Sequence, residues 1–300
     1  MDRNAFLKNT ALLAAGSLFF RQQALAAMFG RPAGTVRMLR NNVGIFTERG
    51  GTIGFCLDRG GVLAIDSQFP DTAAHFIEEI RKQSQAPFAY LLNTHHHGDH
   101  SGGNIAFKGL AGKVLAHQNA AANMRAVAEK AKTLEKQLLP DTTFDRKTRI
   151  RLGDEKLRGH YFGAAHTNGD AVYHFRKANI AHVGDLVFNR RHPFVDRAYG
   201  ANMTHWIEVL NDIHKEFDND TLFIFGHAAE GYEVTGSRAD VLAFRDYLQR
   251  VLDFTRQEIA AGRTKEEFLK NTAIPGVTEW KGDGIVRPLT AAWDELTAGK

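Results

Sequence analysis

Four histidines and one aspartate lie within the six positions from 95 to 100. They come directly after an apolar run at residues 88–92, and this pattern predicts a strand that ends in a loop. Neutral imidazole and carboxylate are ligands that suit zinc and its first-row neighbours. A cluster of imidazoles without a metal would be unfavourable, because the rings repel one another when protonated and lose solvation when buried. The segment therefore predicts a metal-binding loop.

Three more candidate ligands follow apolar runs further along the chain. They are His166, Asp185 and His227, and each has a glycine nearby that lets the backbone approach closely. Strand ends that converge on one sheet edge would bring these side chains to the first loop. His96 is expected to point away from the metal, because the other potential ligands of the loop alternate around it.

The motif His-x-His-x-Asp-His at residues 95–100, with the three downstream residues in this order and spacing, resembles the metallo-β-lactamase fold superfamily. The resemblance extends from about residue 36 to the C-terminus. It implies an α/β fold of the four-layer αββα sandwich type, with two metal ions at the sheet edges. By the family pattern, one metal would be held by His95, His97 and His166, the other by Asp99, His100 and His227, and Asp185 would bridge them.

The resemblance also implies a reaction. Two divalent ions about 3.5–4 Å apart share a water molecule and lower its pKa toward neutrality, so that a bridging hydroxide becomes the nucleophile. Asp99 would bind metal and help to orient this hydroxide, which makes it the candidate catalytic residue. We expect two Zn²⁺ ions as cofactors, with iron or manganese as alternatives, and a small molecule as the substrate.

Fold does not determine substrate, so four functions stay open. The first is an exported two-zinc hydrolase that cleaves an ester, thioester, lactone or amide. The second is a true β-lactamase. Asp185 counts against this second function, because the lactamases that resemble this family usually have cysteine or serine there. An aspartate at this position instead matches glyoxalase II-like thioesterases, lactonases and phosphodiesterases.

The third function is a redox enzyme that resembles the relatives in which a single iron oxygenates persulfides. The full set of seven candidate ligands argues against it. The fourth is a non-catalytic metal-binding or interaction protein on the same scaffold, and an intact ligand set argues against that too.

The first 26 residues have the layout of an export signal. Arg3 and Lys8 precede an apolar run at residues 10–20, and Ala24-Leu25-Ala26 supplies small residues where a signal peptidase cuts. Residues 3–8 also resemble a degraded twin-arginine signal. We therefore expect a mature domain at residues 27–300, in the periplasm or secreted, with an uncleaved amphipathic helix as the alternative. The apolar run is too short for a stable membrane span.

Composition is that of an ordinary globular protein, with 43% hydrophobic and 24% charged residues among 300. The net charge of +4 is mild, and no lysine or arginine run interleaves with aromatics, so we expect no nucleic-acid partner. The single cysteine, Cys56, lies in a strand-like run and is expected to be a buried, inert thiol. Nothing in the sequence decides the oligomeric state.

The remaining chain alternates between β-rich and helical blocks of one domain. Strands are expected at residues 42–46, 52–57, 61–65, 88–92, 113–116, 149–152, 157–162, 171–175, 180–183 and 221–225. Helices are expected from Asp71 to about residue 84, at residues 102–107, at 120–139 before Pro140, at 204–217, and from Ser237 to about residue 261. Thr264 opens a capping-box pattern for a further helix.

Several other residues have predicted roles around the centre. Candidate specificity elements, for which ordinary packing is an equal alternative, are Phe69, residues 124–139, Phe194, Tyr199 and Trp206. His192 is a candidate lining residue of the substrate cleft, since active sites use loops. Asp66 and Asp170 are expected to support ligands or turns rather than to bind metal. Structural roles are expected for His117, His160, His174 and His182.

Overall fold

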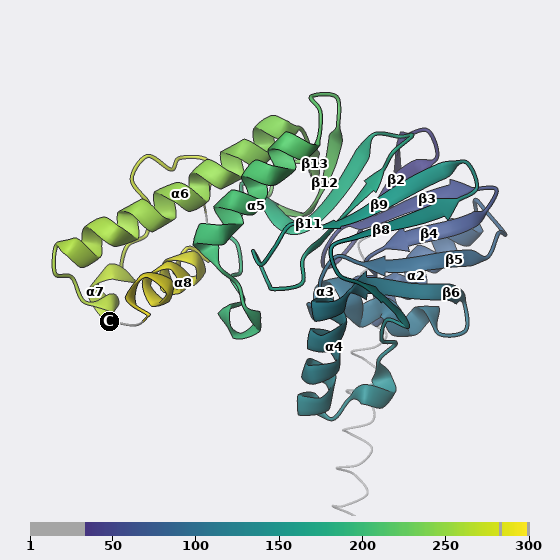
Figure 1. The fold of residues 1–300 in the computed structure, drawn as a ribbon, viewed down its shortest axis with the longest axis horizontal. Coiled ribbons are helices and arrows are strands. Elements are labelled where there is room, and N and C mark those ends of the chain that lie inside the picture. Colours follow the sequence, from purple (N-terminus) through teal and green to yellow (C-terminus); the bar gives the residue numbers. More distant parts are fainter. Residues whose placement is uncertain (1–33, 282–283, 299–300) are drawn as a thin grey trace, which may run out of the picture.

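The computed structural model describes residues 34–281 and 284–298, so the predicted export signal lies outside the described residues. Two mixed β-sheets pack face to face, and helices lie against their outer faces (Figure 1). This is the four-layer αββα sandwich, and the predicted fold class is confirmed.

The first sheet contains seven strands in chain order. β1 to β4 form an antiparallel meander, and β5, β6 and β7 then add in parallel. The bounds are β1 Thr35–Arg40, β2 Val43–Thr47, β3 Ile53–Asp58, β4 Gly61–Ile65, β5 Phe88–Asn93, β6 Ala111–His117 and β7 Thr142–Phe144. The helical segments of this half are α2 Pro70–Arg81, α3 Gly98–Ser101, η1 Gly102–Phe107, α4 Gln118–Ala131 and η2 Leu134–Lys136.

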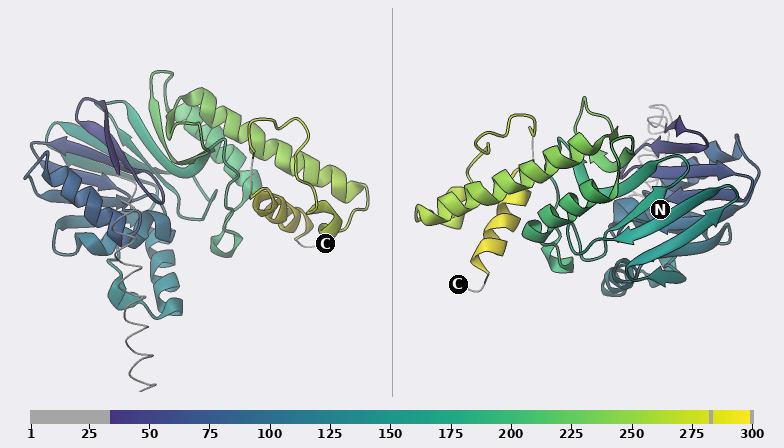
Figure 2. Two further views of the ribbon diagram at one scale, coloured as in Figure 1. Left: turned by 180° about the vertical axis from the view of Figure 1, so that it is seen from behind. Right: turned by 45° about the horizontal axis from the view of Figure 1, so that its top comes forward.

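The second sheet has six strands in the order β13-β12-β11-β10-β9-β8. All neighbours are antiparallel except β11 and β12, which are parallel. The strands are β8 Lys147–Leu152, β9 Glu155–Tyr161, β10 Ala171–Phe175, β11 Ile180–Asn189, β12 Leu222–Ala228 and β13 Thr235–Gly236. The helices are η3 Arg197–Tyr199, α5 Met203–Glu216, α6 Arg238–Ala260, α7 Lys265–Phe268 and α8 Val286–Thr297, and Figure 2 shows that α6, α7 and α8 project beyond the sheet.

Three apolar clusters hold these layers together. Leu63 and Leu92 of the first sheet meet Leu157, Tyr173 and Ile224 of the second sheet in the central cluster. A second cluster packs α2 and η1 against the first sheet, and a third packs α5, α6 and α8 against β10, β11 and β12. Burying these side chains contributes about 25 cal/mol for each Å² of apolar surface removed from water, which is the main force that fixes the two sheets.

Two helices begin or end elsewhere than predicted. α2 begins at Pro70 with Phe69 as its N-cap, so Asp71 lies in the first turn rather than at the cap. α4 ends at Ala131, well before Pro140, because Lys132 takes a left-handed conformation and the Thr133 amide bonds the Ala128 carbonyl. This early end lets the following chain return, so that β7 can pair with β6.

β11 and β12 are longer than predicted. β11 continues to Asn189, past the expected end at residue 183, so Asp185 lies inside the strand rather than after it. Its pairing with β12 shifts register on either side of Gly184, which identifies a bulge. β12 likewise continues through His227. Among the described helices, none combines the length and apolarity needed to cross a bilayer.

Candidate metal centre

The histidine loop leaves the end of β5 and is held by one buried carboxylate. Asp66, at the end of β4, accepts hydrogen bonds from the Thr94 amide and hydroxyl, each at 2.7 Å. Its Oδ2 atom also lies 2.7 Å from Nδ1 of His100. The contacts orient the loop and turn Nε2 of His100 toward the centre, so the geometry agrees with the supporting role predicted for Asp66.

The first group of candidate ligands consists of His95, His97 and His166. Nδ1 of His97 lies 3.1 Å from Nε2 of His95 and 3.0 Å from Nε2 of His166. Nδ1 of His166 lies 2.9 Å from the Phe194 carbonyl, which fixes the orientation of that ring. Three ring nitrogens therefore converge on one point from two separate segments of the chain.

The second group consists of Asp99, His100 and His227. Nε2 of His227 lies 3.1 Å from Oδ2 of Asp99 and 3.3 Å from Nε2 of His100. The His100 ring is fully buried, whereas the side chain of Asp99 is 31% exposed. This second group therefore opens toward solvent on the side of Asp99.

Asp185 lies between the two groups and is buried. Its Oδ1 atom is 3.0 Å from Nε2 of His100, and its Oδ2 atom is 3.5 Å from Nε2 of both His166 and His227. The bulge at Gly184 aims this carboxylate into the centre. Gly226 on β12 leaves room for it, because a Cβ atom there would lie 1.9 Å from Oδ1 of Asp185.

Electrostatics favours the ligand forms of four of these groups, His95, His166, Asp185 and Asp99. His100 differs, because burial lowers the pKa of its ring but the carboxylates of Asp185 and Asp66 outweigh this and raise it well above its usual value. Burial lowers the pKa of His95 well below its usual value and that of His166 to about 3, so both imidazoles are neutral. Burial alone would raise the pKa of Asp185, but the neighbouring His227 and His100 lower it well below its usual range. The pKa of Asp99 falls to about 2 for the same reason, with burial opposed by His227 and His100.

The residues fit a two-metal centre by their own chemistry. Ring nitrogens only 3.0–3.1 Å apart face one another, and neutral nitrogens at this distance are favourable when a cation takes their lone pairs. Oδ1 of Asp185 is buried and makes no hydrogen bond of good geometry among the described residues, although Nε2 of His100 lies 3.0 Å away. Within each group, the ligand atoms of the histidine and carboxylate side chains lie within 4.8 Å of one another. This arrangement is consistent with a dinuclear site.

A sequence profile described as "Metallo-beta-lactamase superfamily" matches residues 54–227, which is more than half of the chain. The chain belongs to the metallo-β-lactamase superfamily. With its histidine and aspartate clusters, it is a metal-dependent hydrolase of this fold.

Individual members of the superfamily match the chain with low to moderate sequence identity. A "Hydroxyacylglutathione hydrolase" of Erythrobacter litoralis is 34% identical, over 81% of this chain and 90% of its own length. A "Metallo-beta-lactamase type 2" of Elizabethkingia meningoseptica is 23% identical over 56% of this chain, which spans only 64% of that lactamase. The solved "Metallo-beta-lactamase from Pontibacter korlensis" shares the fold, with a TM-score of 0.59 and 18% identity over 72% of this chain and 99% of its own.

One residue of the centre was missed by the sequence analysis. Asp196, on the loop after β11, places Oδ2 2.8 Å from Nε2 of His97 and 3.4 Å from Nε2 of His96. It thereby orients the His97 ring so that its other nitrogen, Nδ1, faces His95 and His166. His96 belongs to neither group, and its ring lies toward Asp196 and Tyr199. With His97 and Asp196 it forms a further group of potential ligands within 4.8 Å, so its predicted absence from metal binding stays a prediction. No spacing pattern in the sequence identifies Asp196, because it meets the loop only in the folded chain.

The predicted specificity elements divide into two kinds. Phe194 is 46% exposed, and its ring centroid lies 5.4 Å from that of His97, at the edge of the centre. Trp206 is fully buried, and its indole donates to the Leu186 carbonyl, so it belongs to the core behind His166. His192 is also buried, and its ring lies 2.7 Å from the Tyr247 hydroxyl, so it joins the loop to α6.

The other predicted elements lie around the loop. Phe69 caps α2 beneath the Arg49 guanidinium, and the predicted helix at 124–139 is the second half of α4 followed by η2. Asp170 accepts hydrogen bonds from the Thr167 amide and hydroxyl and stabilises the turn after His166. These contacts agree with the turn-stabilising role predicted for Asp170.

The remaining histidines and the cysteine have structural surroundings. His117 caps α4 and stacks on Tyr161, and His182 lies against the Thr52 carbonyl. His160 stacks on Phe162, and His174 lies near the Asn179 side chain. Cys56 is fully buried, and burial raises the pKa of its thiol to about 12, so it is inert as predicted.

Proposed function

We propose that this protein is an exported hydrolase that uses two zinc ions to cleave a small ester, thioester, lactone or amide. The observation that carries the proposal is the position of Asp185, whose carboxylate lies between the two groups of histidines. In this proposal, His95, His97 and His166 hold one ion, Asp99, His100 and His227 hold the other, and Asp185 bridges them.

When bound, the two ions would activate a water molecule and polarise the oxygen of the scissile carbonyl. The side chain of Asp99 is 31% exposed, against 4% for Asp185, so it can reach a water molecule at the mouth of the centre. Its lowered pKa keeps it a carboxylate at neutral pH, and as an acceptor it would orient that water for attack. Asp99 is therefore the proposed catalytic residue.

An apolar hollow beside the first group supports a substrate with an apolar part. Phe194 and Val195 form one wall, and Val286 and Ala291 of α8 form the other. Phe194 also orients His166 through its carbonyl, and its ring centroid lies 5.4 Å from that of His97, so the hollow adjoins the first group. An acyl or alkyl group bound there would place the adjacent carbonyl near the first ion.

Two observations favour an ester or thioester over a β-lactam. The hydroxyacylglutathione hydrolase of Erythrobacter litoralis is 34% identical over 81% of this chain, whereas the lactamase relatives are 23–26% identical over 50–66% of it. Asp185 also stands where the resemblance leads us to expect cysteine or serine in a lactamase. We therefore place β-lactam hydrolysis second among the candidate activities.

The test is a substrate panel with the zinc-loaded full chain. We expect turnover of an ester, thioester, lactone or amide with an apolar acyl group, and a loss of at least about 100-fold in His97→Ala. His214→Gln on α5 is the matched control and should keep full activity. Turnover of β-lactams alone would replace the proposal with the second activity, and no turnover across the panel would contradict it.

The export part of the proposal rests on the sequence of residues 1–26, with its charged start, apolar run and small residues at 24–26. It implies a mature domain at 27–300 that acts in the periplasm or outside the cell. Mass spectrometry of protein from the native host should find Ala27 at the N-terminus, and a chain that begins at Met1 would contradict export.

A further inference from the structure

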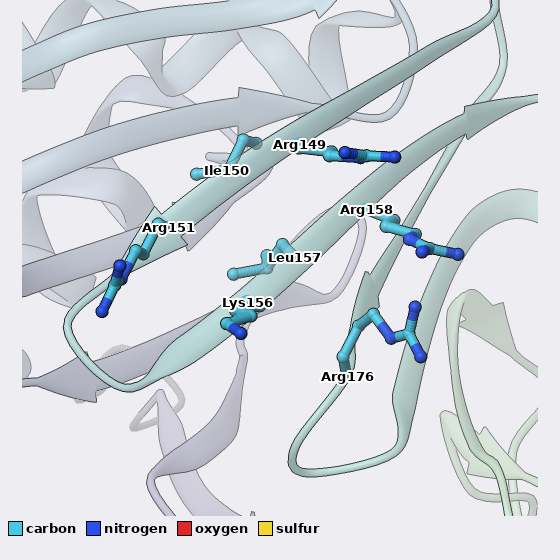
Figure 3. A pocket seen from close by; sticks show the side chains of 7 residues that line it. All are labelled: Arg149, Ile150, Arg151, Lys156, Leu157, Arg158 and Arg176. Atoms are coloured by element: carbon cyan, nitrogen blue, oxygen red, sulfur yellow. The ribbon is translucent and has the colours of Figure 1, made fainter.

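A basic surface covers the outer face of β8, β9 and the end of β10. Its side chains, which we call the basic face, are Arg149, Arg151, Lys156, Arg158 and Arg176 (Figure 3). They line one shallow hollow, and none of them belongs to the metal centre. We propose that the basic face docks the protein on the surface of an anionic lipid membrane.

The strands place these cations side by side. In the antiparallel register, Arg149 lies directly opposite Arg158, and Arg151 lies directly opposite Lys156. The residues between them, Ile150 and Leu157, point inward and are buried in the central core. Like charges opposite one another destabilise a strand pair, so the fold carries a cost here that a bound anion would remove.

No internal partner neutralises the basic face. Among residues 34–281 and 284–298, no carboxylate forms an ion pair with any of its five cations. The nearby Asp154 carboxylate pairs at 2.6 Å with Arg59, a cation outside the basic face.

The shape of the basic face favours a lipid surface over other polyanions. Its cations lie on three adjacent strands about 4.8 Å apart, which makes a two-dimensional array rather than a track. The seven residues that line the hollow include no aromatic side chain on which a nucleotide base could stack. A planar array of cations without stacking groups suits a layer of anionic headgroups.

A protein partner also fits poorly. Protein interfaces are anchored by buried aromatic and large apolar side chains at their centre. None of the exposed large apolar residues of the described chain lines the hollow of the basic face; they are Met38, Leu110, Val127, Leu134, Phe194, Tyr232 and Val286. Attraction to an anionic membrane requires no such anchor, because clusters of four to eight lysine or arginine residues bind headgroups by charge.

A protein docked on a membrane through the basic face would keep its metal centre accessible to substrate. The metal centre is built on the loops after β5 and β9 and on β11 and β12, whereas the basic face lies on the outer side of β8 and β9. Variants of the basic face should therefore change membrane binding without changing hydrolysis. The inference does not depend on the proposed substrate.

The test is co-sedimentation of the full chain with phosphatidylcholine vesicles that contain or lack about one third phosphatidylglycerol. We expect binding to the anionic vesicles alone, and its loss at about 0.5 M salt, because ions screen exposed charges. The double variant Arg149→Gln/Arg158→Gln should bind roughly 25-fold more weakly, at about fivefold for each cation removed. The matched control Arg256→Gln/Arg263→Gln, which removes the same charge from the far end of α6 and the turn that follows it, should bind like the original protein.

Four outcomes would overturn the proposal. The first is failure of the original protein to bind anionic vesicles at low salt, and the second is equal weakening in both double variants. The third is displacement from vesicles by inorganic phosphate at constant ionic strength, which would assign the face to a small anion. The fourth is tighter binding to single-stranded DNA than to vesicles. Circular dichroism and hydrolytic activity that match the original protein establish that each variant is folded.

Discussion

Asp196 determines which nitrogen of His97 faces the centre. With Nε2 of the ring 2.8 Å from the Asp196 carboxylate, Nδ1 is the atom that meets His95 and His166. Partners of this kind fix the tautomer of a metal-binding imidazole and raise its basicity. Asp196 is therefore a positioning residue for the first group of ligands.

We predict that Asp196→Asn lowers the affinity of the first metal by about 10–100-fold, because an amide holds the ring without its negative charge. A titration against a competing fluorescent chelator measures this affinity. Asp246→Asn, on the exposed face of α6, is the control and should leave the affinity unchanged. Equal affinities for Asp196→Asn and the original protein would contradict the role of Asp196.

His160 makes stability depend on pH at a point distant from the centre. Both of its ring nitrogens are buried without hydrogen-bond partners among the described residues. Burial lowers the pKa of the ring to about 4, against the smaller opposing effect of Glu216. Between pH 6.5 and 4 the unfolded chain therefore binds a proton that the folded chain does not, and the free energy of unfolding falls as the pH falls.

The variant His160→Phe should remove this pH dependence while it keeps the stacking on Phe162. We expect its free energy of unfolding to fall less than that of the original protein between pH 7 and pH 4.5, by about 1–3 kcal/mol. Urea unfolding of metal-free protein in chelator measures the difference without interference from metal release. Parallel pH profiles for the two proteins would contradict the prediction.

At the scale of elements, the bulge in β11 builds the bridge between the two ligand groups. Gly184 has a φ of +52°, and a Cβ atom there would lie 2.7 Å from the Thr94 hydroxyl, in the loop that begins the histidine motif. A larger residue would push the histidine loop away from β11. The bulge therefore joins the two sheets at the point where Asp185 enters the centre.

We predict that Gly184→Ala destabilises the protein by about 1–3 kcal/mol and weakens metal binding, because both the backbone and the contact with Thr94 are strained. Gly109→Ala is the matched control, since its φ is +77° and nothing lies within 4 Å of the added atom. Denaturant unfolding and metal titration of both variants test this. Equal effects would show that the conformation alone, and not the contact with Thr94, matters.

The bulge in β11 is one place where the end of a strand could not be predicted from the sequence. The apolar runs that form β3, β4 and β5 are continuous and bounded by turns, so their ends were predicted closely. In β11 the residues Gly184 and Asp185 interrupt the apolar run and therefore resemble the end of a strand. Pairing with β12 nevertheless continues the strand to Asn189. Tertiary pairing, which a local pattern does not contain, decides such cases.

At the scale of the molecule, the sequence predicts which candidate ligands cluster but not what surrounds them. His95, His166 and Asp185 lie together because the strands bring their ends to one edge, and that they bind metal stays a prediction. Asp196 and the basic face depend on which side chains meet or stay unpaired after folding. Asp196 leaves no periodic signal. The alternation of cations and apolar residues at 149–152 and 156–158 places the cations on one face of each strand, but only the strand register brings Arg149 opposite Arg158.

We propose that this chain holds two metal ions, with Asp185 between them. The most direct measurement is metal content per chain by plasma mass spectrometry, for the original protein and for Asp185→Ala, after dialysis. We expect two zinc ions per chain in the original protein and fewer than one in the variant, with hydrolysis lost in parallel. One iron per chain, or a variant that keeps both its metal and its activity, would contradict it.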